Sequence, residues 1–204
     1  MALNNSANAA EQLRLDYKSF YSHLRQLDDE QLSDLQFAFG FKLVNSQELC
    51  TVEEVYVHTD KLDIPVVVDT RNRFVLPTEK ALKLAQAVVV IDLLPAANKC
   101  DLSVQLEVSP DALTESIGIK ELRRYFAAFA AFFKEMGGML SFLMPSPDGL
   151  IIYLNDTSSL QDPWRQHLDS SQKKLLINKT ELETISFSAL DSASVSHITA
   201  QMAQ

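Results

Sequence analysis

Glycine, cysteine and long apolar runs are all scarce in this chain. Its 204 residues include five glycines, at positions 40, 118, 137, 138 and 149, and these form neither of the common glycine-rich loops that hold nucleotide phosphates. The sequence has no Gly-x-Ser-x-Gly nucleophile motif. No stretch approaches the roughly 20 apolar residues that cross a bilayer. We therefore expect no ATP, GTP or dinucleotide cofactor and no membrane span.

Basic side chains are also in the minority. Eighteen lysines and arginines stand against 27 acidic residues, which gives a formal net charge of −9. Phosphate backbones and anionic lipid head groups repel a negative surface, so we expect no nucleic-acid partner. The apolar share of 47% and the charged share of 22% are close to globular averages. A chain of this length folds as one generous domain or two small ones.

The two cysteines, Cys50 and Cys100, leave two interpretations open. Each lies at the start of a strand-like segment, so a bond between them would join the two ends of one structural unit. The chain-entropy model assigns roughly 4 kcal/mol of stability to closing a loop of about 50 residues. In the other interpretation they are two buried free thiols that behave as small hydrophobic side chains.

The first half of the sequence predicts one helix followed by several strands. Apolar and aromatic residues recur at steps of three and four from Glu11 to Leu27, which indicates an N-terminal helix within residues 1–30. From Leu35 to Leu43 large side chains alternate with small or polar ones, a strong strand pattern. We predict a small antiparallel β-sandwich for residues 31–108, with further strands at 55–57, 65–68, 74–76, 88–94 and 102–108 and a short helix within 78–86.

The second half predicts an α+β module over residues 109–191. A long aromatic helix at 119–136 ends at Gly137-Gly138. An apolar hairpin follows, with arms at 139–144 and 150–154 and Asp148-Gly149 in its turn. We also expect a short helix near Trp164, last strands at 175–177 and 185–190, and a weakly specified tail at 192–204. The expected fold class is therefore α+β: a small antiparallel β-sandwich, then an α+β half built on the aromatic helix and the hairpin.

The four histidines give little sign of a metal or catalytic site. They are scattered, and none stands at helical ligand spacing from another ligand: His23, His58, His167 and His197. His58 with Asp60 comes nearest to a metal-binding pair, because residues i and i+2 of a strand share a face. Two such residues before a surface turn are common by chance. We assign no residue to catalysis, to a cofactor or to a metal.

The predicted aromatic helix is a candidate contact surface. Large side chains such as Phe126, Phe129 and Phe133 surround its middle, with alanines between them. Such a stripe is most often part of a core, but an apolar surface on all sides needs cover from the sandwich, the hairpin or a second subunit. The helix at 119–136 is therefore a candidate homodimer interface.

Two parts of the sequence resemble an uncharacterised protein family. One runs from Cys50 to Val108 and contains Phe74-Val75-Leu76-Pro77 and Cys100-Asp101-Leu102-Ser103; the other runs from Gly138 to Pro145 and continues with Asp148-Gly149-Leu150. They look like a family of secreted or periplasmic Gram-negative bacterial proteins that carries only a domain-of-unknown-function label. The resemblance implies export and a Cys50–Cys100 disulfide, with no activity attached. The first part also looks like prealbumin-like β-sandwich modules, which bind or brace.

These features support three functional hypotheses. The first is a non-enzymatic accessory or binding protein of the cell envelope, periplasmic or secreted, whose partner is a protein or small ligand of the envelope. The second is a hydrolase with a dispersed site that uses His58, Asp60 or another acid. The third is a cytoplasmic protein with reduced thiols that assembles through the aromatic helix. The small, polar start of the chain has no secretory signal and favours the cytoplasm if read literally, but a mature chain after signal removal begins in the same way.

Overall fold

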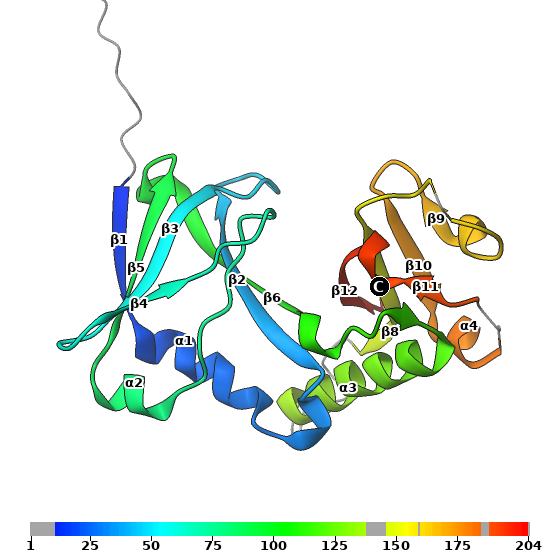
Figure 1. Cartoon of the computed structure of the whole chain (residues 1–204), viewed down its shortest axis with the longest axis horizontal. Coiled ribbons are helices and arrows are strands. Elements are labelled where there is room, and N and C mark those ends of the chain that lie inside the picture. Colours follow the sequence, from blue (N-terminus) through cyan, green and yellow to red (C-terminus); the bar gives the residue numbers. More distant parts are fainter. Residues whose placement is uncertain (1–10, 138–145, 159, 185–187, 204) are drawn as a thin grey trace, which may run out of the picture. The chain divides into compact units, whose positions relative to one another are not determined.

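The computed structural model of the protein describes residues 11–137, 146–158, 160–184 and 188–203. The structure combines helices with antiparallel sheets (Figure 1). This combination confirms the predicted α+β class. The chain divides into two compact units that alternate along the sequence. Unit 1 comprises Met1–Gln26 and Phe37–Gln105, and unit 2 comprises Leu27–Gln36 and Leu106–Gln204. Within the described residues, no helix has the length and apolar character needed to cross a membrane.

Unit 1 is built on a four-stranded antiparallel sheet of order β1-β5-β3-β4. Its strands are β1 (Glu11–Asp16), β3 (Thr51–His58), β4 (Asp63–Val66) and β5 (Val88–Leu94). The valine-rich β5 lies between β1 and β3. Its residues Val89, Val90 and Ile91 are completely buried, as expected where a central strand is covered on both faces.

Two short helices lie at one end of this sheet, α1 (Tyr17–Leu24) and α2 (Lys80–Leu84) (Figure 1). The phenol of Tyr17 connects them, because it donates to the carbonyl of Pro77 and accepts from the backbone N–H of Glu79. Phe20 packs edge-on against Phe39 with ring centroids 5.1 Å apart. The position of α1 is therefore set by both a buried polar contact and core packing.

A second sheet pairs β2 (Leu35–Leu43) with β6 (Cys100–Val108). The strand predicted at Leu35–Leu43 is confirmed, and its alternating Phe37, Phe39 and Phe41 are buried. A Cβ on Gly40 would lie 3.0 Å from the carbonyl oxygen of Asn72. The turn that carries Asn72 approaches β2 this closely because Gly40 has no side chain.

Unit 2 contains a four-stranded antiparallel sheet of order β12-β8-β10-β9. Its strands are β8 (Pro147–Leu154), β9 (Leu168–Asp169), β10 (Lys174–Asn178) and β12 (Val195–Met202). The long helix α3 (Ile119–Gly137) confirms the predicted aromatic helix and packs on β8 (Figure 1). It buries Leu122, Tyr125 and Phe129.

Smaller elements complete the two units. In unit 2, α4 (Lys179–Thr184) begins with a reciprocal cap in which Asn178 and Glu181 exchange hydrogen bonds. The short strands β7 (Ser116–Ile117) and β11 (Leu190–Asp191) pair with each other. The described 3₁₀ helices are Arg25–Leu27, Glu30–Leu32, Ala97–Lys99, Pro110–Ala112, Trp164–His167 and Ser192–Ser194.

The predicted N-terminal helix is wrong over its first six residues. Glu11–Asp16 is strand β1, which pairs with β5, and the helix begins only at Tyr17. Leu13 and Leu15 alternate with exposed polar residues, a pattern of period two. The spacing from Leu13 to Tyr17 fits a helix as well, and only the partner strand distinguishes the two.

The prediction of a weakly specified tail is also wrong. Val195–Met202 forms β12, which pairs with β8 along its length. Its valine, isoleucine and threonine favour a strand, whereas its serine, alanine, glutamine and methionine do not, so the local preference is mixed and pairing with β8 decides the strand.

The predicted hairpin turn at Asp148-Gly149 is wrong as well. Both residues lie inside β8, where Gly149 pairs with Asn178 and Gln201. The predicted arm at 150–154 is part of the same strand, and the arm at 139–144 lies outside the described residues. Of the strand predicted at 74–76, only isolated bridges at Phe74 form, to Phe39 and Val68. The last strand predicted, at 185–190, lies partly outside the described residues; Ser188 and Ala189 are not in a strand, and Leu190 begins β11.

Candidate functional site

The two cysteines lie together in unit 1. Their sulfur atoms are 2.08 Å apart and their α-carbons 6.4 Å apart. The backbone N–H of Cys50 donates to the carbonyl of Phe41, and Val44 donates in the same way to Lys99 next to Cys100. The disulfide thus joins the residue just before β3 to the first residue of β6.

His58 has a different partner from the one considered in the sequence. Its Nδ1 lies 2.6 Å from Oδ1 of Asp63. The antiparallel register of β3 and β4 places residues 58 and 63 opposite each other. Asp63 could therefore have been predicted as the partner of His58 only from the pairing of these two strands. Both side chains are about half exposed. The pair lies outside the described hollows.

The other histidines lie at separate places in the two units. His23 packs edge-on against Phe37 in unit 1. In unit 2, His167 lies 3.5 Å from the carboxylate of Glu181, and His197 stacks on the ring of Tyr153. Over the residues that the structure describes, no group of three or more His, Cys, Asp or Glu side chains is arranged to hold a metal ion.

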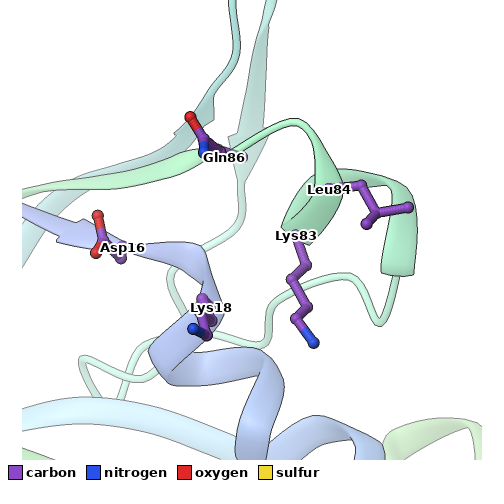
Figure 2. A pocket seen from close by; sticks show the side chains of 6 residues that line it. Asp16, Lys18, Lys83, Leu84 and Gln86 are labelled. Carbon is purple, nitrogen blue, oxygen red and sulfur yellow. The ribbon is translucent and has the colours of Figure 1, made fainter.

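No sequence pattern indicated a hollow of about 610 Å³ that lies where α1 meets α2 in unit 1. Three segments form it. They are the end of β1 with the first turn of α1, the last turn of α2, and the start of the loop that leads from α2 to β5. The lining residues are Asp16, Lys18, Lys83, Leu84, Gln86 and Ala87 (Figure 2).

Hydrogen bonds between backbone groups hold these three segments together. The N–H of Tyr17 donates to the carbonyl of Ala87, and the N–H of Ala87 donates to the carbonyl of Leu82. Between them Gln86 has a left-handed backbone with a φ of 51°, which ends α2 and turns the chain toward β5. The hollow is therefore a product of the tight connection between α2 and β5.

The charge of this hollow is positive, although the chain as a whole is acidic. Lys18 stands in the first turn of α1, where the N–H dipoles already create positive potential. Lys83 reaches toward α1, with its Nζ 5.3 Å from the ring centre of Tyr21 (Figure 2). The lining holds two ammonium groups and one carboxylate, that of Asp16, which makes no capping hydrogen bond to α1. This arrangement suits an anionic group.

In a second hollow, in unit 2, two of the polar side chains are engaged within the fold. It measures about 300 Å³ and is lined by residues around Trp164 and Ser194. The indole N–H of Trp164 donates to the carbonyl of Ser188, and the hydroxyl of Ser194 donates to the carbonyl of Asp191. These bonds fix the loop before β12. A further hollow of about 350 Å³ in unit 2 lies between the 3₁₀ helix Glu30–Leu32 and the end of α3.

Two buried charged side chains also went unnoticed in the sequence. In unit 1 the guanidinium of Arg73 donates to the carbonyl of Ala38 at 3.1 Å and to Oγ of Ser103 at 3.3 Å. In unit 2 the carboxylate of Glu107 accepts from the side chain of Gln36 at 3.0 Å. A buried charge is stable only when hydrogen-bonded, so these groups hold strands and turns in place.

The aromatic residues of α3 divide between core and surface. Phe129 is completely buried, whereas Phe126 and Phe133 are partly exposed. The predicted role of this helix in a dimer stays a prediction.

Comparison with known proteins assigns a family and no activity. A family model described as a protein of unknown function (DUF2987) matches residues 9–154. No curated protein and no solved structure matches the chain.

Proposed function

This chain belongs to the DUF2987 family of proteins of unknown function, and we propose that it is a non-enzymatic accessory or binding protein of the bacterial cell envelope, periplasmic or secreted. The observation that carries the proposal is the disulfide between Cys50 and Cys100. Disulfides persist in oxidising compartments and are rare in the cytosol, where thiols are kept reduced. The bond therefore favours the envelope over the cytoplasm.

The binding part of the proposal is supported by the hollow between α1 and α2. Lys18 and Lys83 bring two positive charges to a concave surface of unit 1, and the exposed side chain of Leu84 adds apolar surface at its border. An envelope ligand with a carboxylate or phosphate group, or the acidic segment of a partner protein, has the complementary charge.

The location is tested with protein from its native cells. Cells are fractionated by osmotic shock, and the intact mass of the protein is measured without reductant and again after reduction. We expect the protein in the envelope fraction, with a mass about 2 Da below that of the reduced form because disulfide formation removes two hydrogens. Protein in the cytosolic fraction with two free thiols would contradict the proposal.

The binding role is tested with a panel of carboxylate- and phosphate-containing small molecules and acidic peptides, read out by thermal shift. A ligand at the hollow should stabilise the wild type and lose this effect in the double variant Lys18→Gln with Lys83→Gln. The matched control is Lys61→Gln with Lys80→Gln, which removes two lysines of unit 1 that do not line the hollow. Equal stabilisation of both double variants would show that the hollow is not the binding site.

A further inference from the structure

Most edge strands of the described sheets carry a feature that discourages pairing with another chain. In unit 1, β4 has four residues and contains Pro65, and β1 presents the charged Arg14 and Asp16. In unit 2, β9 has two residues and β12 has two register irregularities. Short length, proline, charge and bulges are the means by which natural proteins protect sheet edges.

Strand β6 lacks most of these features, and its only charged residues, Asp101 and Glu107, lie toward its two ends. It has nine residues, Cys100–Val108, and contains no proline, lysine or arginine. Among the described strands it pairs only with β2, so one of its edges has no strand partner there. Between Asp101 and Glu107 the five residues are uncharged and alternate apolar with polar.

The part of β6 in unit 1 also exposes apolar side chains. Leu102 and Val104 are 45% and 38% exposed, and as residues i and i+2 they share one face of the strand. An unprotected strand with an apolar stripe is a template for adding a further strand.

We propose that two copies of the chain pair through β6 as antiparallel strands, with Ser103 of one copy opposite Ser103 of the other. A two-fold axis through Ser103 places Leu102 of each copy opposite Val104 of the other copy, so this apolar pair forms twice. On the other face it places Asp101 opposite Gln105. Every exposed apolar side chain of this segment gains an apolar partner, and no like charges meet.

Neighbouring registers are less favourable. An axis through Val104 would place Asp101 opposite Glu107, two acidic residues directly across from each other. An axis through Leu102 would place Leu102 opposite Leu102 of the second copy. It would place Val104 opposite the disulfide-bonded Cys100. The side-chain sequence of β6 therefore selects the pairing centred on Ser103.

The expected dimer is weak and depends on salt. Pairing of one strand per copy buries little surface, below the roughly 1,200 Å² of stable complexes. Two chains of net charge −9 repel each other at long range, and salt screens this repulsion while leaving the apolar contact in place. Dimerisation should therefore strengthen with protein concentration and with ionic strength.

The test is sedimentation velocity of the full chain over a concentration series at low and high salt. Val104→Lys places a charge on the edge and should weaken dimerisation by about tenfold or more, equivalent to about 1.4 kcal/mol. The matched control is Leu84→Lys, which changes an exposed apolar residue of unit 1 away from β6 and should leave dimerisation unchanged. Far-ultraviolet circular dichroism establishes that each variant is folded.

The register is tested by cysteines at the two positions that the proposed axis places opposite each other. Leu102→Cys mixed with Val104→Cys should form a disulfide-linked dimer under mild oxidation, because directly opposed residues bring their Cβ atoms to about 5 Å, whereas either variant mixed with Asp60→Cys, in an exposed turn, should stay monomeric. This measurement does not depend on how Val104→Lys folds. A monomer at every concentration, or a dimer that is lost with Phe133→Lys in α3 but not with Val104→Lys, would overturn the proposal.

Discussion

Gly149 in β8 lies so close to Ile177 in β10 that a Cβ added to Gly149 would be 2.2 Å from the carbonyl oxygen of Ile177. That distance is far inside van der Waals contact. Gly149 pairs with Asn178 on one side and with Gln201 of β12 on the other. The absence of a side chain at this position therefore allows β8 and β10 to approach closely at this end of the unit 2 sheet.

Gly149→Ala should destabilise the protein by about 3 kcal/mol, at the upper end of overpacking costs, because the group that must move is backbone. The free energy of unfolding in urea measures this effect. Gly118→Ala is the matched control, because the nearest atom to its Cβ would be Oε2 of Glu121 at 3.1 Å, the end of a flexible side chain. If the two substitutions cost the same, the close approach of β8 and β10 is not as described.

Removal of the disulfide should lower stability substantially. The double variant Cys50→Ala with Cys100→Ala opens a loop of 50 residues, and the chain-entropy model predicts a loss of about 4 kcal/mol. Urea unfolding of the double variant, compared with the wild type with and without reductant, measures this loss. Reductant should lower the midpoint of the wild type and leave that of the double variant unchanged. A wild type insensitive to reductant would count against a closed disulfide.

The backbone of Gln86 should make glycine the better residue there. Its φ of 51° lies in the left-handed region, which costs a residue with a Cβ about 1 to 2 kcal/mol, while glycine adds about 0.5 to 1 kcal/mol of unfolded-state entropy. Gln86→Gly should therefore stabilise the protein by about 0.5 to 1 kcal/mol. The preceding Ala85 has an ordinary φ of −76°, so Ala85→Gly should destabilise it by a similar amount. Chemical denaturation of the pair checks both signs.

Stability should fall in alkaline solution because of two buried tyrosines. Burial raises the pKa of Tyr17 and of Tyr125 above the ordinary value of 10.0. A raised pKa means that the folded state holds the phenol proton more tightly than the unfolded state. The stabilisation is therefore fully present below pH 10 and is lost as pH rises through the folded-state pKa values.

Two measurements check this expectation. The phenolate absorbance of the folded protein should show part of the tyrosine titrating later than in the unfolded chain. The free energy of unfolding should decline more gently with alkaline pH in Tyr125→Phe than in the wild type, since one of the two phenols is gone. Identical slopes would mean that Tyr125 titrates alike in both states.

Local patterns were enough to predict some elements. The alternation from Leu35 to Leu43 and the aromatic spacing of 119–136 produced a strand and a helix with nearly those bounds. Both are long and strongly periodic, so one face of each is apolar whatever its neighbours are. The run Val88–Leu94 was also recognised as a strand, because β-branched residues fill it.

The candidate site was beyond such patterns. The hollow brings Lys18 beside Lys83 from segments far apart in the sequence, and nothing near either lysine indicates the other. The pairing of His58 with Asp63 required the β3–β4 register, and the closeness of Cys50 to Cys100 was implied only by family resemblance.

The sequence by itself determined the α+β class, the central helix and the strongly periodic strands, because periodicity is a property of neighbouring residues. Only the tertiary structure decided that Glu11–Asp16 and Val195–Met202 are strands and that Gly149 continues β8 instead of turning it. In these segments the local preference is weak or ambiguous, and the free energy that selects the strand comes from hydrogen bonds and packing against β5 and β8.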